Sequence, residues 1–181
     1  MKTALLKSMT EQNRGIMKYL VVAARGGKKA LLVLTERTTR FQHIILIKDK
    51  TQKSVISAIN RLERRQGLEK FHTLFKSITC DNGVAFQNFE GIEKSVFSKT
   101  KKRTKVYFAH PYSFYERGSN ENANRLIRRF LPKGCTFDKL RQRDVQKLAR
   151  WMNKNPGKLF AGMSANDKAK EFGLNFKPAK T

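Results

Sequence analysis

Cysteine, histidine and long apolar runs are scarce in this chain of 181 residues. Its 2 cysteines, Cys80 and Cys135, lie far apart and its 3 histidines are scattered, so neither a zinc site nor a disulfide framework is indicated. The longest apolar run near the start, residues 20–24, is far too short to span a bilayer, and no cleavage pattern follows it. We therefore expect a cytoplasmic protein without a signal peptide or a membrane helix.

Acidic residues are also few: 14 Asp and Glu stand against 39 Lys and Arg, which leaves a formal net charge of +25. A domain this basic attracts a phosphate backbone, because its cations displace the counterions that surround a nucleic acid. The alternatives are a basic protein without a polyanionic partner and a protein that binds acidic lipid. No basic amphipathic helix with an aromatic face supports the lipid alternative. The composition therefore favours nucleic acid as the partner.

The chain is long enough for one ordinary hydrophobic core, and we interpret it as one domain. We place this domain at residues 18–176, after an N-terminal extension of unclear role (1–17) and before a basic tail (177–181). Three apolar runs of strand length open it, at residues 19–24, 30–35 and 41–47. The links between them are too short for a parallel crossover, so an antiparallel meander is predicted.

The middle of the chain alternates between helix and strand patterns. Thr51 is a candidate N-cap for a helix that ends at Gly67, because the apolar residues between them recur at helical spacing. Two short strands are predicted at residues 77–80 and 105–109, with a polar, lysine-rich insertion at residues 94–104 ahead of the second. This order predicts an α/β fold with an antiparallel start.

Three helices are predicted in the last third of the chain. Asn120 is expected to cap the first, which Pro132 ends. Its predicted buried stripe consists of Ala123, Leu126, Ile127 and Phe130. The second helix lies around residues 145–152, and the third begins at Ser164, which has Asp167 three residues further on and therefore fits a capping box.

Asp81 is the first candidate site residue. It directly follows the predicted strand 77–80 and precedes Asn82 and Gly83, a pair that favours a tight turn. The carboxyl edge of an open α/β sheet is where such folds bind ligands, so Asp81 is placed to contact one. The alternative is that Asp81 only caps its own turn.

Glu121 is the second candidate, at the predicted start of a helix and on the side away from its apolar stripe. Alone, it is better explained as a carboxylate that interacts favourably with the helix dipole and pairs with Arg125. Its surroundings are rich in donors suited to phosphate oxygens. These candidate DNA-binding residues are Arg117, Asn120, Asn122, Asn124, Arg125, Arg128, Arg129 and Lys133. Two carboxylates among phosphate donors suggest a metal-dependent phosphodiester site.

Three segments carry a resemblance to a known family: CDNG at residues 80–83, the stretch at residues 107–134, and GGKKALLVLTERTTR at residues 26–40. They resemble the catalytic domain of insertion-sequence transposases of the thirty family, which are DDE recombinases. The resemblance implies a ribonuclease H-like integrase core, an α/β fold whose mixed five-stranded sheet is flanked by helices. It also implies that Asp81 and Glu121 are catalytic residues that hold Mg²⁺ or Mn²⁺.

The same resemblance implies partners and an activity. The expected reaction is cleavage of DNA at transposon ends followed by strand transfer to target DNA. The expected assembly is a homo-oligomer on DNA, in the cytoplasm of a bacterium and associated with its nucleoid.

This sequence departs from the family pattern at three places. Tyr19 stands where the family has its first metal-binding aspartate, and a phenol with a pKa near 10 is a poor Mg²⁺ ligand. The interval from Asp81 to Glu121 is longer than usual, with the excess assigned to residues 94–104, and residues 1–17 do not resemble the family's helix-turn-helix region. We therefore expect impaired strand transfer. The alternative is a non-catalytic nucleic-acid-binding module derived from a transposase.

Overall fold

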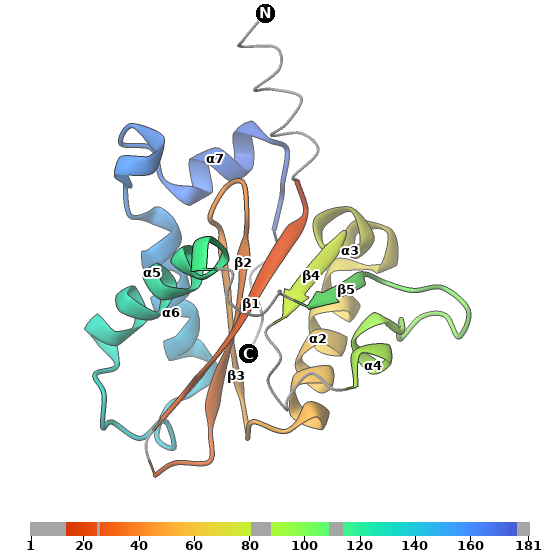
Figure 1. Cartoon of the computed structure of the whole chain (residues 1–181), viewed down its shortest axis with the longest axis horizontal. Helices are drawn as coiled ribbons and strands as arrows, with labels where there is room; N and C mark the ends of the chain where they lie inside the picture. Colours follow the sequence, from red (N-terminus) through yellow and green to blue (C-terminus); the bar gives the residue numbers. More distant parts are fainter. Residues whose placement is uncertain (1–13, 25, 81–87, 109–113, 177–181) are drawn as a thin grey trace, which may run out of the picture.

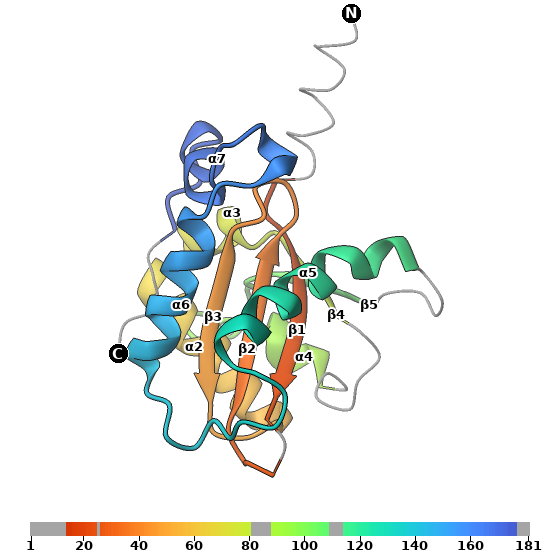
Figure 2. The same cartoon turned by 90° about the vertical axis from the view of Figure 1, so that its left-hand side faces the viewer.

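The computed structural model of this chain describes residues 14–24, 26–80, 88–108 and 114–176, with backbone alone for residues 114–120. A five-stranded mixed sheet lies at its centre, in the order β3-β2-β1-β4-β5, and helices cover both faces (Figures 1 and 2). The predicted α/β class with a mixed five-stranded sheet is confirmed, and the architecture is that of a ribonuclease H-like fold. Within the described residues, no helix has the length and hydrophobicity that crossing a bilayer requires.

The first three strands form the predicted antiparallel meander. They are β1 (Ile16–Ala23), β2 (Ala30–Glu36) and β3 (Gln42–Ile47). β2 pairs antiparallel with both neighbours, so β1 and β3 run in the same direction. All residues of β2 are buried, as expected for a central strand covered on both faces. β1 begins two residues before the predicted domain start at residue 18.

The connection from β3 to β4 crosses the sheet through two helices. α2 (Gln52–Gln66) begins after Thr51, whose side chain accepts a hydrogen bond from the Ser54 backbone N–H, and it ends at Gly67, as predicted. α3 (Leu68–Leu74) follows at once. β4 (Ser77–Cys80) then pairs parallel with β1, and β5 (Lys105–Phe108) pairs parallel with β4. The carboxyl ends of β1, β3, β4 and β5 therefore meet at one edge of the sheet.

The core has two halves, one on each face of the sheet, and successive β1 residues alternate between them. Met17 and Tyr19 belong to the half that packs against α2 and α3. Val22 belongs to the half that packs against α5 (Phe114–Phe130) and α6 (Gln142–Lys154), with partly buried Leu20 beside it. A side chain on β1 thus faces either α2 or α5, and its position in the strand decides which.

The start of α5 was predicted wrongly. This helix begins at Phe114, so Asn120 lies within it and is not its N-cap. Gly118 and the asparagines around it have low helix propensity, which is why the sequence placed the start too late. The sequence does contain a signal for the earlier start, because Ser113 and Glu116 have the spacing of a capping box.

Two further expectations for the helices need correction. Phe130, predicted to be buried, has 48% of its surface exposed and packs edge-on against Trp151, with ring centroids 4.5 Å apart. The short helices α3 and α4 (Phe89–Glu93) were not predicted at all. The other two predicted C-terminal helices are confirmed as α6 and α7 (Ala165–Glu171), and Ser164 and Asp167 form the expected capping box of α7.

α6 makes hydrogen bonds to the outer edge of β3. The Gln42 backbone N–H donates to Asn153 Oδ1 over 2.8 Å, and Asn153 Nδ2 donates back to the Gln42 carbonyl over 2.9 Å. At the other end of the strand, the Leu46 N–H donates to Gln142 Oε1 over 2.9 Å. Side chains of α6 thus satisfy backbone groups that an edge strand would otherwise leave without partners.

The insertion at residues 94–104 is anchored in the interior and is not the simple surface loop that its lysines suggested. Arg103 is fully buried, and its Nη1 contacts Glu63 Oε2 on α2 at 2.9 Å. The same guanidinium donates to the carbonyls of Ile92 and Gly91 over 2.7 and 3.0 Å. Glu63 also accepts from the Ser95 hydroxyl and from the Val96 N–H. The insertion is therefore tied to α2 and α4 by a buried ionic network.

His43 gives the fold a dependence on pH. It lies on β3 among the rings of Phe41, Phe75 and Phe176, with centroids 5.0, 5.3 and 4.8 Å away, and burial lowers its pKa to about 3. The folded chain therefore keeps this imidazole neutral at a pH where the unfolded chain protonates it. Its contribution to stability is complete above pH 6.5 and is lost as the pH falls toward 3.

We expect the free energy of unfolding of the unmodified chain to fall more steeply below pH 6.5 than that of His43→Leu, by up to about 1.4 kcal/mol for each pH unit. Urea denaturation at several pH values between 7 and 4.5 measures both slopes. Both proteins contain the same carboxylates, so the difference between the two slopes reports the protonation of His43. Parallel slopes would contradict the assignment.

Candidate metal and nucleic-acid site

The two candidate metal ligands come from different parts of the fold. Asp81 lies outside the described residues, and it follows Cys80, the last residue of β4. Cys80 itself lies at the edge of the sheet where the parallel strands end. Glu121 lies well inside α5, not at its first turn, and its side chain is exposed as predicted. The convergence of the two carboxylates stays a prediction.

α5 directs the side chain of Glu121 away from the sheet. Ala123 and Ile127, two and six residues further along, are 1% and 0% exposed and pack against β1 and β2 residues of the core. Figure 2 shows α5 crossing the sheet face, with its N-terminal half extending past β1 on the side of β4 and β5. Because residues 123 and 127 face the sheet, residue 121 is directed away from it.

The residues predicted to contact DNA differ in how exposed their side chains are. Arg129 and Lys133 are exposed, as are Asn122 and Arg125, and Asn124 is half-buried. Arg125 Nη2 donates to Asn122 Oδ1 over 2.9 Å, so Arg125 contacts Asn122. Within the described residues Glu121 forms no ion pair, so the Glu121–Arg125 pair of the alternative interpretation is not formed. The side chains of Arg117 and Asn120 lie outside the described residues.

Arg128 differs from the other cations of α5. It is half-buried, and its Nη2 donates to the carbonyl of Ala23, at the end of β1, over 3.0 Å. This bond fixes the last turn of α5 to the sheet. Arg128 therefore has a structural role in addition to the phosphate contact predicted for it.

Tyr19 is 1% exposed and lies in the core half beneath α2 and α3. Ala123 and Ile127, which anchor the helix of Glu121, belong to the other half of the core, on the opposite face of the sheet. The phenol at position 19 is thus a core side chain. Among the described residues, no three His, Cys, Asp or Glu side chains are grouped so that they could hold a metal ion.

Comparisons with known proteins identify relatives of this chain. No family model matches it. The probable transposase for insertion-like sequence element IS1161 of Streptococcus salivarius is 34% identical over 139 residues, which are 77% of this chain and 36% of that protein. The transposase for insertion sequence element IS4351 of Bacteroides fragilis is 36% identical over 104 residues, 58% of this chain and 30% of that protein.

A third relative belongs to the element after which the family is named. Transposase InsI for insertion sequence element IS30A of Escherichia coli is 30% identical over 132 residues, 71% of this chain and 31% of that protein. The chain spans about a third of the length of these curated relatives. From these similarities and its fold, the chain belongs to the insertion-sequence transposases of the thirty family.

Proposed function

We propose that residues 18–176 are the catalytic core of a DDE transposase, acting on DNA at transposon ends and at the target. The observation that carries this proposal is the similarity to three transposases on a chain with a mixed five-stranded α/β fold. Ile16 and Met17, the first residues of β1, are added to this core. The residues before β1 and residues 177–181 are proposed as an extension and a basic tail outside it. The net charge of +25 supports a polyanionic partner.

Asp81 and Glu121 are the proposed metal ligands, and hard carboxylate oxygens suit Mg²⁺ or Mn²⁺. A bound divalent cation would supply Lewis-acid activation of the phosphodiester. The exposed Arg125, Arg129 and Lys133 neutralise the phosphates of the bound strand and hold it against α5. The reaction in this family also implies that several copies of the chain assemble on DNA.

The burial of Tyr19 supports the proposal that this chain has a reduced strand-transfer activity. A phenol within the core offers no carboxylate to a metal site, so two acids are left where the family uses three. The same observation favours a second candidate function, a non-catalytic module that binds nucleic acid with the fold and charge of a transposase. The two functions differ in whether Asp81 and Glu121 bind metal.

We expect Mn²⁺ to bind the chain and Glu121→Gln or Asp81→Asn to weaken that binding by at least about tenfold, since each removes one of the two anionic ligands. Isothermal titration calorimetry measures this effect. Glu69→Gln, which removes an exposed carboxylate on α3, is the matched control and should leave Mn²⁺ affinity unchanged. Cleavage of transposon-end DNA in Mn²⁺ should be weak or absent.

Three other results would contradict part or all of the proposed function. Equal Mn²⁺ affinity in all four proteins would favour the binding module over the enzyme. Robust cleavage by the unmodified chain would refute the proposed impairment. DNA affinity that stays flat as salt rises would reject both functions, because binding through phosphates must weaken with salt.

A further inference from the structure

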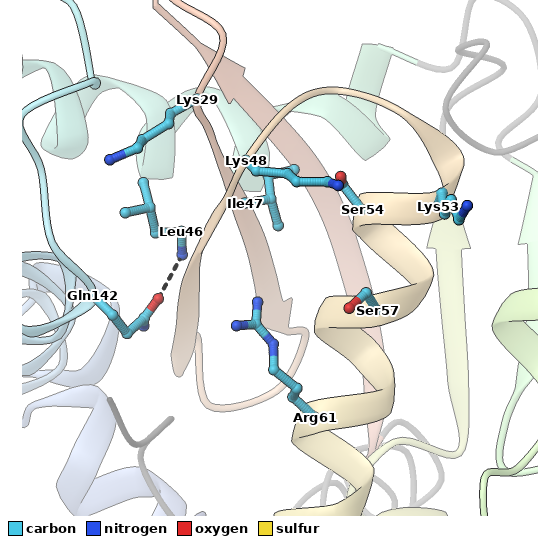
Figure 3. Close-up of a pocket in the computed structure, with 9 residues that line it drawn as sticks. All are labelled: Lys29, Leu46, Ile47, Lys48, Lys53, Ser54, Ser57, Arg61 and Gln142. Carbon is cyan, nitrogen blue, oxygen red and sulfur yellow. Dashed lines mark hydrogen bonds between the residues drawn. The ribbon is translucent and has the colours of Figure 1, made fainter.

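A hollow of about 530 Å³ lies beside the carboxyl end of β3, between α2 and the start of α6. Four cationic side chains line it, together with two hydroxyls, and no carboxylate does (Figure 3). The cations are Lys29, Lys48, Lys53 and Arg61, and the hydroxyls belong to Ser54 and Ser57. We call this hollow the basic pocket.

Three of the four α2 residues of the basic pocket form one helical row. Lys53, Ser57 and Arg61 follow each other at intervals of four, so they share one face of the helix. Figure 3 shows the Arg61 guanidinium directed into the space between α2 and β3, and the Lys48 side chain reaching across toward Ser54. Arginine presents a planar fork of donors that matches phosphate oxygens, and the lysines add point charge.

The charge of the pocket is not neutralised from within. Lys29 Nζ donates to two backbone carbonyls, those of Asp138 and Leu140, over 2.7 and 3.1 Å, and neither of these acceptors carries a formal negative charge. Among the described residues, Lys48, Lys53 and Arg61 form no ion pair. The neighbouring carboxylate of Asp49 accepts hydrogen bonds from Thr51 and does not line the pocket.

The pocket opens on the edge of the sheet that holds the proposed catalytic site. β3 ends at the same edge as β4, after which Asp81 follows, and three strand spacings separate the two strands. At about 4.8 Å for each spacing, the pocket lies roughly 14 Å from the end of β4. Along a duplex at 3.4 Å for each step of one strand, this corresponds to about four base pairs.

We propose that the basic pocket binds a backbone phosphate of the DNA whose scissile bond lies at the proposed site, about four base pairs away. This inference rests on the proposed function and adds a second, sequence-independent contact to it. Its occupant is a phosphodiester in a polymer, because the pocket lies in line with the strand ends and its lining supplies four cations and two hydroxyls without a carboxylate. Phosphate contacts of this kind fix the position of a duplex.

The first test is binding of the full chain to a fluorescent 30-base-pair duplex at several salt concentrations in EDTA, so that metal plays no part. The double variant Lys48→Gln, Arg61→Gln should reduce the slope of log affinity against log salt by about two. The control, Lys158→Gln with Lys170→Gln, removes the same charge from exposed positions in η2 (Lys158–Phe160) and α7, at the opposite end of the sheet (Figure 1). The control slope should stay near that of the unmodified chain.

The second test measures proximity rather than charge. In a Cys135→Ser background, which removes the exposed native thiol, Ser57→Cys should crosslink to duplex DNA carrying a thiol-reactive group on its phosphates. Thr73→Cys replaces an exposed hydroxyl on α3, near the start of β4, and should crosslink at least tenfold less. Crosslinking competed by unlabelled duplex but not by inorganic phosphate identifies the polymer as the occupant.

The outcomes separate this inference from the proposed function. If the unmodified chain binds DNA but both double variants lose the same slope, or Ser57→Cys crosslinks no better than Thr73→Cys, the pocket is not a DNA contact while the proposed function stands. If inorganic phosphate blocks crosslinking as well as duplex does, the site takes free phosphate instead. If the unmodified chain binds no DNA, both the pocket and the proposed function are refuted.

Discussion

Replacing Arg103 by alanine should lower the free energy of unfolding by about 3–5 kcal/mol, because the substitution leaves the carboxylate of Glu63 buried without its cation. The two side chains are each 0% exposed, so water cannot replace the lost contact. The carbonyls of Ile92 and Gly91 lose their donor at the same time. Urea denaturation followed by circular dichroism measures the change.

Two controls make the Arg103 result specific. Lys102→Ala removes the neighbouring cation, which pairs with Glu93 from a side chain that is 70% exposed, and should change stability little. The double variant Glu63→Leu, Arg103→Met removes both charges and should recover the part of the loss that comes from the unpaired carboxylate, while the hydrogen bonds to Ile92 and Gly91 stay lost. A loss below about 1 kcal/mol in Arg103→Ala would show that the network does not hold the insertion.

Tyr19→Asp should destabilise the chain by more than about 4 kcal/mol, because it places an unpaired carboxylate among apolar side chains beneath α2 and α3. Tyr19→Phe keeps the ring and should cost about 1 kcal/mol or less. Thermal unfolding distinguishes these results. The experiment also tests the proposed function, since the family resemblance implies an aspartate at this position.

A different result for Tyr19→Asp would be equally informative. If the variant folds as stably as the unmodified chain and gains Mn²⁺-dependent cleavage of DNA, position 19 faces a metal site and the core placement of its side chain is wrong. If it unfolds, restoring activity requires changes beyond this single residue.

The strands and α2 were predictable because local signals coincide there with the final environment. The apolar runs of β1 to β3 are separated by short links, and Thr51 and Gly67 mark the limits of α2 by side-chain capping and by a positive φ of 83°. The same signal misled at α3, because a helix that ends at Gly67 gives no indication that another starts at Leu68.

Features that depend on distant partners were not predictable. In the sequence, Arg103 is indistinguishable from the other cations of a lysine-rich insertion. Its contact with Glu63 forms only when the insertion packs against α2. The basic pocket likewise draws on Lys29, Lys48 and α2, which tertiary structure alone assembles. In the candidate site, the exposure of Glu121 could be predicted from helical periodicity. The face of the sheet on which Tyr19 is buried could be assigned only once the strand register was known.

The bonds from Asn153 and Gln142 to β3 also limit how molecules of this protein associate. An open strand edge is a template on which another chain can add a strand, and such growth leads to aggregates. Here α6 blocks that template at the β3 end of the sheet. Intermolecular β-pairing through β3 would first have to displace α6, which makes this side of the molecule resistant to fibril-like growth.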